Sequence, residues 1–121
     1  TENNMSLSPC LHYRDYIYIS DAIKGFIKLT FVNESGVVNL AGGEAIQLKN
    51  FVKLFWRELG ANPDRLIFGG HEQPLYEQSQ PKAYSDQSKI KRLTGWTPKT
   101  SINDGIKLTI EEMKKNAQLS N

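Results

Sequence analysis

The 121-residue sequence contains a single cysteine, Cys10, and only two histidines. One cysteine cannot form an internal disulfide, which suits a reducing compartment, and we therefore expect a cytoplasmic location. No apolar run approaches the roughly 20 residues that a membrane-spanning helix needs. We accordingly expect no membrane partner.

Patterns typical of a nucleophile or a metal site are also missing. No serine or cysteine lies in a G-x-S-x-G motif, and neither His12 nor His71 has a partner at metal-ligand spacing. We therefore assign no catalytic residue and no metal ligand to this sequence.

The charge is nearly balanced, with a formal net charge of +2. From Lys82 onward, however, eight Lys and Arg residues face four Asp and Glu residues. These lysines lack a regular series of interleaved aromatic residues that could stack on bases, so we interpret them as a solvated helix face rather than a nucleic-acid interface.

Hydrophobic periodicity predicts short strands that alternate with helices. Residues 1–12 are polar and are expected to form an irregular lead-in. The expected strands cover residues 16–20, 37–40, 65–68 and, less regularly, 83–86. The expected helices run from a cap at Ser20 or Asp21 to about Thr30, from Gln47 to Leu59, from a cap at Asp86 to Leu93, and from a cap at Ser101 to about Lys115. Gly60 and Gly95 are expected to end the second and third of these helices.

Strands alternating with helices indicate an α/β fold with mostly parallel pairing. Three or four short strands make a poor sheet by themselves, and the sequence begins at Thr1 rather than at a methionine. We therefore expect the chain to be the trailing portion of a larger α/β protein.

Two features near the expected strands leave alternatives open. Arg14, in the stretch HYRDYIYISDAI, is either a paired surface arginine or a group that holds an anion, and Tyr16 lies on the same face of an extended strand. The glycine loop in NLAGGEAIQL runs into a helix, where backbone amides can receive an anion, but it is equally a tight turn. It lacks the G-x-G-x-x-G spacing of a dinucleotide-binding loop.

Three stretches in order carry a resemblance: RDYIYISDAIKGFI, GVVNLAGGEAIQLKNFVKLF and AYSDQSKIKRLTGWTPKTSINDGIKLTIEEM. Together they resemble the C-terminal part of the NAD(P)-dependent nucleotide-sugar epimerases and dehydratases of the extended short-chain dehydrogenase/reductase family. The resemblance implies a Rossmann-type fold without its N-terminal cofactor-binding half. It also implies a nucleotide-sugar-binding portion at residues 13–116, followed by a tail at residues 117–121.

The resemblance implies roles for several residues. By position, Arg14 contacts the pyrophosphate of a nucleotide-diphosphate sugar, Tyr16 lies near the nucleotide, and Leu48 packs on the base. The family's second phosphate-binding arginine is replaced by Tyr76, which carries no charge, and Lys82 is the cation that could substitute for it.

The family's Gly-rich cofactor motif and its catalytic Tyr-x-x-x-Lys are absent from this sequence. The resemblance therefore implies NAD or NADP for an intact member and no cofactor on this chain alone, which is catalytically incomplete. The alternative is a non-enzymatic remnant or stand-alone α/β module that self-associates or binds a protein partner. In either case we expect a homo-oligomer or a missing N-terminal half, because exposed strand edges need cover.

Overall fold

A computed structural model describes residues 3–78 and 84–119. Its elements, in chain order, are β1 (Met5–Leu7), β2 (Tyr13–Asp15), α1 (Ile19–Leu29), β3 (Ala45–Gln47), α2 (Leu48–Glu58), a 3₁₀ turn (Pro63–Arg65), β4 (Leu66–Phe68), α3 (Leu75–Gln78), α4 (Ser88–Thr94) and α5 (Ile102–Leu119). The alternation of short strands and helices confirms the expected α/β class. In this part of the chain, no helix combines the length and apolar character that crossing a membrane requires.

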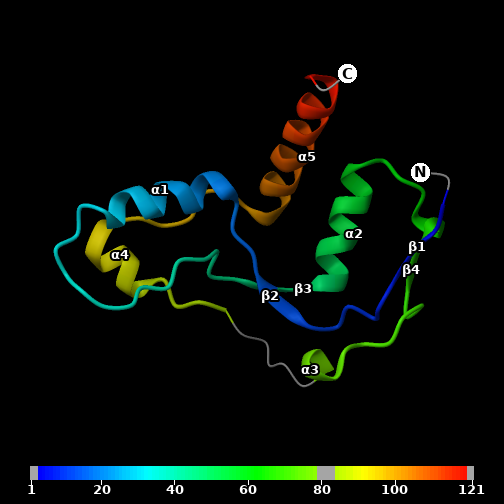
Figure 1. Ribbon diagram of the computed structural model, residues 1–121, viewed down its shortest axis with the longest axis horizontal. Coiled ribbons are helices and arrows are strands. Elements are labelled where there is room, and N and C mark those ends of the chain that lie inside the picture. Colours follow the sequence, from blue (N-terminus) through cyan, green and yellow to red (C-terminus); the bar gives the residue numbers. More distant parts are fainter. Residues whose placement is uncertain (1–2, 79–83, 120–121) are drawn as a thin grey trace.

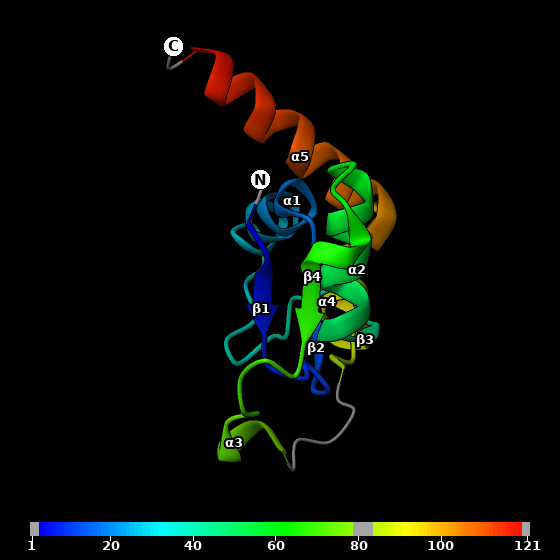
Figure 2. The ribbon, with the colours of Figure 1, turned by 90° about the vertical axis from the view of Figure 1, so that its right-hand side faces the viewer.

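The strands form two separate pairs. β1 and β4 are parallel, with Met5 opposite Leu66, whereas β2 and β3 are antiparallel, with Arg14 opposite Ile46. The β2–β3 pair lies at the centre of the molecule, with α1 and α4 on one side and α2 and the β1–β4 pair on the other (Figure 1). A view turned by 90° shows α5 extending away from the remaining elements (Figure 2).

The four helices that the sequence predicted are confirmed, with ends close to those expected except that α5 continues to Leu119 instead of ending at about Lys115. α2 ends before Gly60, which has the left-handed φ of 68° that a residue after a helix often adopts, and Gly95 ends α4 with φ 73°. At the start of α5, the Ser101 hydroxyl accepts a hydrogen bond from the backbone amide of Asp104 at 3.1 Å. The expected strand at residues 65–68 is also confirmed, as β4.

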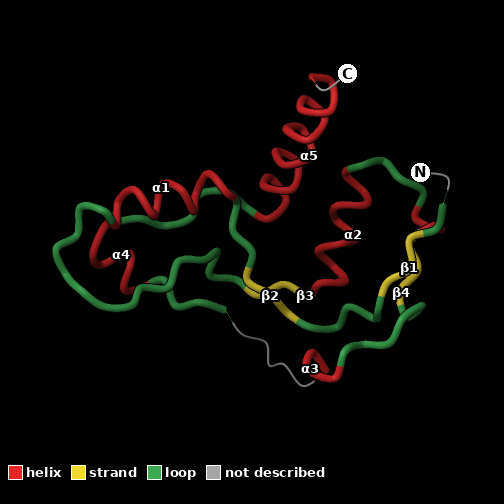
Figure 3. The backbone as a smooth tube through the Cα atoms, in the orientation of Figure 1, coloured by secondary structure: helices red, strands yellow, loops and turns green. Residues whose placement is uncertain are grey.

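Several strand predictions are wrong, as the arrangement of strands and loops makes clear (Figure 3). The strand expected at residues 16–20 lies earlier, at β2, because β3 pairs there and Tyr16 turns away to stack on Phe51. Residues 37–40 form no strand, since no described segment pairs with them. Residues 84–86 are irregular, and Ala83 of the same expected strand lies outside the described residues.

The ends of the chain also differ from expectation. The lead-in at residues 1–12 contains β1, which pairs with β4 far along the sequence. The tail expected at residues 117–121 is helical as far as Leu119, the last residue of α5.

The cap expected at the start of α1 is wrong as well. The helix begins at Ile19, and its N-cap residue, Tyr18, makes no side-chain cap hydrogen bond. Asp21 lies in the first turn with 2% of its surface exposed, and its carboxylate accepts hydrogen bonds from the amides of Lys99 and Thr100 at 3.1 and 2.8 Å. Asp21 therefore ties α1 to the loop before α5 instead of capping its own helix.

Trp96 completes the contact between α1 and α4. Its indole nitrogen donates to the carbonyl of Asp21 at 3.0 Å, and its ring is 4% exposed. Gly25 of α1 must be small, because a Cβ there would lie 2.6 Å from Cδ1 of Leu40 and 3.1 Å from the Trp96 ring. Together with the fully buried Ile90 of α4, these residues form the core of what we call the α1–α4 lobe.

We predict that Asp21→Ala lowers the free energy of unfolding by about 2–3 kcal/mol, because the amides of Lys99 and Thr100 lose a charged, buried acceptor. The measurement is urea unfolding followed by tryptophan fluorescence. Asp64→Ala, at an exposed carboxylate, is the matched control. Equal unfolding midpoints for the two variants would show that the Asp21 bridge does not stabilise the fold.

Candidate functional site

Three of the five predicted binding residues lie at one junction, where β2, β3 and α2 meet. Arg14 is in β2, Leu48 is the first residue of α2, and Tyr16 follows β2 directly. The backbone carbonyls of Cys10 and His12 accept hydrogen bonds from the amides of Lys49 and Leu48, each at 2.9 Å. The segment before β2 thus satisfies free amides of the first turn of α2 and fixes its start.

Arg14 is half-buried, and its guanidinium donates to the carbonyl of Tyr13 at 2.8 Å. A guanidinium has five N–H donors in a planar fork, and this bond to the backbone orients that fork. The sequence left open whether Arg14 pairs with a neighbouring side chain or holds an anion. The bond to Tyr13 shows that the backbone itself positions this cation.

Asp15, next to Arg14, has a different role. Its carboxylate accepts hydrogen bonds from the amides of Gly42 at 2.8 Å, Gly43 at 3.0 and 3.1 Å, and Ser85 at 2.9 Å. The glycine loop, whose amides the sequence offered as a candidate anion site, therefore binds a carboxylate of its own chain. A Cβ at Gly42 would collide with the carbonyl of Tyr16 and lie 2.9 Å from the Asp15 carboxylate, so only glycine fits there.

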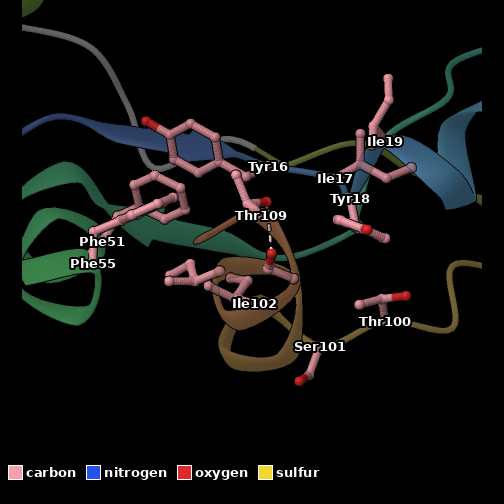
Figure 4. Close-up of a pocket in the computed structure, with 12 residues that line it drawn as sticks. Tyr16, Ile17, Tyr18, Ile19, Phe51, Phe55, Thr100, Ser101, Ile102 and Thr109 are labelled. Atoms are coloured by element: carbon pink, nitrogen blue, oxygen red, sulfur yellow. Dashed lines mark hydrogen bonds between the residues drawn. The ribbon is translucent and has the colours of Figure 1, made fainter. Parts of the chain in front are cut away.

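Tyr16 borders an apolar cavity of about 260 Å³ between α2 and α5 (Figure 4). Its ring stacks on Phe51 with a centroid separation of 4.0 Å and an interplanar angle of 10°, and Phe55 meets Phe51 edge-on at 5.3 Å. Ile102 and Thr109 of α5 line the other side, where the Thr109 hydroxyl donates to the carbonyl of Gly105 at 2.7 Å. Tyr16 also borders a second cavity of about 310 Å³ beside Gly42.

Burial raises the pKa of the Tyr16 hydroxyl above its ordinary value of 10.0, and the nearby positive charge of Arg14 acts in the opposite direction. The balance indicates that Tyr16 stays protonated at neutral pH. At neutral pH this hydroxyl can therefore donate a hydrogen bond.

The remaining two predicted residues lie elsewhere or outside the described chain. Tyr76 is in α3 with 72% of its surface exposed, and Lys82 lies outside the described residues. The side chain of Gln73, three residues before Tyr76, contacts Nδ1 of His12 at 3.1 Å and accepts from the amide of Leu11 at 3.4 Å. This tether fixes the approach to α3 beside the start of β2.

Sequence reasoning missed Asp15 and Gln73 as the residues that position the site. The sequence did contain a signal for Asp15. This aspartate follows a strand-like stretch, and the Gly-Gly pair at residues 42–43 has no side chains to hinder access to its backbone amides. Gln73 gave no signal, because it lies in a stretch without periodicity. Over residues 3–78 and 84–119, no three His, Cys, Asp or Glu side chains cluster as metal ligands.

We predict that Gly42→Ala destabilises the protein by about 2 kcal/mol, since the added methyl group must displace backbone or break the Asp15 bridge. Gly105→Ala is the control, because a Cβ there meets Cβ of Tyr18 at 3.4 Å inside a helix. That change should be neutral or stabilise the fold by up to about 1 kcal/mol. Thermal unfolding of both variants checks the contrast, and a Gly42→Ala protein as stable as Gly105→Ala would contradict it.

We predict a loss of stability above about pH 10 that depends on Tyr16. The pKa of Tyr16 is higher in the folded state, so its contribution is complete below the unfolded pKa. It is lost as the pH rises through the folded pKa. Tyr16→Phe should reduce the difference in unfolding free energy between about pH 8 and pH 10.5, whereas Tyr84→Phe, at an exposed tyrosine, should not. The same pH dependence in both variants would refute the assignment.

No family model matches the chain, but individual known proteins are similar to it. The chain is 29% identical over 107 residues to UDP-glucuronate 4-epimerase from Thermodesulfobacterium geofontis, covering 88% of this chain and 32% of that protein. In structure it resembles dTDP-glucose 4,6-dehydratase from Bacillus anthracis in complex with NAD, with a TM-score of 0.78, 18% identity, and coverage of 96% of this chain and 36% of the other.

A second solved structure gives a similar result. UDP-glucuronic acid 4-epimerase from Bacillus cereus, in complex with UDP-glucuronic acid and NAD, has a TM-score of 0.73 and 20% identity, covering 93% of this chain and 35% of the other. The chain thus spans about a third of the length of the relatives it matches. In sequence and in fold, the chain is therefore similar to the C-terminal part of the nucleotide-sugar epimerases and dehydratases of the extended short-chain dehydrogenase/reductase family.

Proposed function

We propose that this chain forms the nucleotide-sugar-binding portion of an NAD(P)-dependent sugar epimerase or dehydratase. The observation that carries the proposal is the convergence of Arg14, Tyr16 and Leu48 at the β2–β3–α2 junction. A cation, an aromatic hydroxyl and an apolar side chain match the three parts of a nucleotide diphosphate that a site must recognise. The relatives support the same substrate class, since one acts on UDP-glucuronate by name and another holds UDP-glucuronic acid.

In this proposal, Arg14 binds the diphosphate. A guanidinium can make two parallel hydrogen bonds to phosphate oxygens, and the bond to the Tyr13 carbonyl orients the fork in advance. Leu48 supplies an apolar contact for the base at the start of α2. The ring of Tyr16 is held by Phe51, which leaves its hydroxyl to meet the nucleotide.

At the second phosphate position, this chain offers weaker binding groups than an arginine. Tyr76 stands where the family places an arginine, and a phenol carries no charge at neutral pH. Lys82 would supply a compact cation without the bidentate geometry of arginine. We therefore propose that Arg14 contributes most of the affinity for the diphosphate.

We propose that the described residues do not hold the pyrophosphate of a dinucleotide cofactor. The glycine loop is the feature nearest to such a site, and the amides of Gly42 and Gly43 are already bonded to Asp15. We propose that NAD or NADP is held by the part of the family fold that this chain does not span, and we assign no catalytic residue here. The single, buried Cys10 supports a cytoplasmic location.

Titration calorimetry tests the proposal with UDP-glucuronic acid, UDP-glucose, dTDP-glucose and GDP-mannose. We expect one of these ligands to bind and Arg14→Ala to weaken it about 10- to 100-fold, the value of a charge-assisted hydrogen bond. Arg14→Lys should recover only part of the affinity, because it keeps the charge and loses the fork.

Arg57→Ala is the control, since that arginine is exposed on α2 and contacts Glu58 at 3.8 Å. The Arg57→Ala variant should bind the nucleotide sugar with the same affinity as the unmodified chain. If Arg14→Ala and Arg57→Ala bind the same nucleotide sugar equally well, Arg14 is not the phosphate contact. If none of the four ligands binds, this chain does not form a nucleotide-sugar site.

A further inference from the structure

A further cavity, of about 600 Å³, lies between α2 and β4 (Figure 2). We call it the α2–β4 cavity. Its volume falls within the range of about 300–1,000 Å³ that is typical of small-molecule sites. Phe51 and Phe55 of α2 line the cavity beside Tyr16, whereas Lys49 and Lys53 line this one. The two cavities therefore use different faces of the same helix.

The interior of the α2–β4 cavity is apolar. Trp56 is 9% exposed, and its indole nitrogen donates to the carbonyl of Asn62 at 2.8 Å. Because that bond satisfies the polar atom of the side chain, Trp56 presents an apolar ring to the cavity. Leu66 and Phe68 are half-buried and add apolar surface from β4, since alternate residues of a strand share one face. The interior therefore suits an apolar group.

Two ammonium groups meet at the border of this cavity. Nζ of Lys49 lies 5.2 Å from the centroid of the Phe68 ring, and Nζ of Lys53 lies 5.9 Å from the same centroid. No carboxylate among residues 3–78 and 84–119 forms an ion pair with either lysine. Two like charges held beside one ring repel each other, and an anion bound to both would relieve that repulsion.

We propose that the α2–β4 cavity binds an amphipathic carboxylate. The acidic group lies at the ammonium groups of Lys49 and Lys53, and the aliphatic body packs against Trp56 and Leu66. An ammonium is a compact point charge, so it pairs with a carboxylate without the bidentate geometry that a guanidinium imposes. The proposal concerns a second ligand and does not depend on the nucleotide-sugar site.

A nucleotide is a poorer occupant of this cavity. Bases stack on accessible aromatic faces, whereas Trp56 is buried and both ammonium groups lie over the ring of Phe68. The third cation of this side of α2, Arg57, is already 3.8 Å from the carboxylate of Glu58. A single acidic group on an aliphatic body fits these charges better than a polyphosphate does.

Nuclear magnetic resonance tests the proposal with three probes of equal chain length: octanoate, octanol and octylammonium. The chain has two tryptophans, of which Trp56 lines the cavity and Trp96 belongs to the α1–α4 lobe. We expect octanoate to shift the indole N–H signal of Trp56 and not that of Trp96. Octanoate should bind about 10-fold more tightly than octanol, and octylammonium should bind more weakly than octanol.

A double variant separates the contribution of charge from that of apolar contact. Lys49→Met with Lys53→Met keeps two long apolar side chains and removes both charges. It should weaken octanoate binding about 10-fold and leave octanol binding unchanged. Lys107→Met with Lys114→Met is the matched control, because both lysines are exposed on α5 and the net charge changes equally. Its octanoate affinity should equal that of the unmodified chain.

A second variant tests the apolar part of the site. Ala61 is half-buried and lines the cavity, so Ala61→Leu should fill part of the space and weaken octanoate and octanol alike. Both lysines remain in this variant. An unchanged affinity for both probes would show that they do not enter the cavity and would overturn the proposal.

Other outcomes would also overturn it. These are the absence of octanoate binding, equal octanoate affinity of the two double-lysine variants, and octanol binding as tightly as octanoate. Displacement of octanoate by UDP-glucuronic acid would assign the cavity to a nucleotide instead. Arg14→Ala should bind octanoate like the unmodified chain, so failure of carboxylate binding and failure of nucleotide-sugar binding are separable.

Discussion

The carboxylate of Asp15 is the interaction on which the arrangement of this chain depends. It joins three segments that are distant in the sequence: β2, the glycine loop at residues 42–43, and the stretch before α4 at Ser85. A charged acceptor with several amide donors is among the stronger hydrogen-bonding arrangements in proteins. Asp21, in the first turn of α1, makes a similar arrangement of hydrogen bonds with the loop before α5. Two aspartates thus compensate for sheets of only two strands each.

The Asp15 bridge also determines what Arg14 can do. Successive side chains of a strand point to opposite faces, so fixing Asp15 toward the glycine loop directs Arg14 to the other face of β2. The acidic residue organises the backbone, and the basic one is presented beside Tyr16 and the start of α2, where the proposed diphosphate site lies.

The elements that could be predicted from the sequence are those whose hydrogen bonds are local. The backbone hydrogen bonds of α2, α4 and α5 form within each helix. Hydrophobic periodicity and, for α2 and α4, the glycine that follows the helix were therefore enough to predict them. A strand depends on a partner that the local pattern does not reveal. Pairing with β3 moved β2 to residues 13–15, and the absence of a partner left residues 37–40 irregular. Of the site, Arg14, Tyr16 and Leu48 followed from the family motifs, whereas the tether by Gln73 required the fold.

The use of the glycine loop has a consequence for phosphate recognition. Many nucleotide sites hold phosphate with backbone amides at the start of a helix. Here the amides of Gly42 and Gly43 bind a carboxylate of the same chain, so in the proposed site the recognition of a diphosphate is assigned to side chains. We propose an uncharged Tyr76 at the second phosphate position, which leaves Arg14 as the guanidinium that binds the diphosphate. Affinity on this proposal is then sensitive to the geometry of Arg14, and the Asp15 bridge, by fixing β2, becomes a determinant of binding as well as of folding.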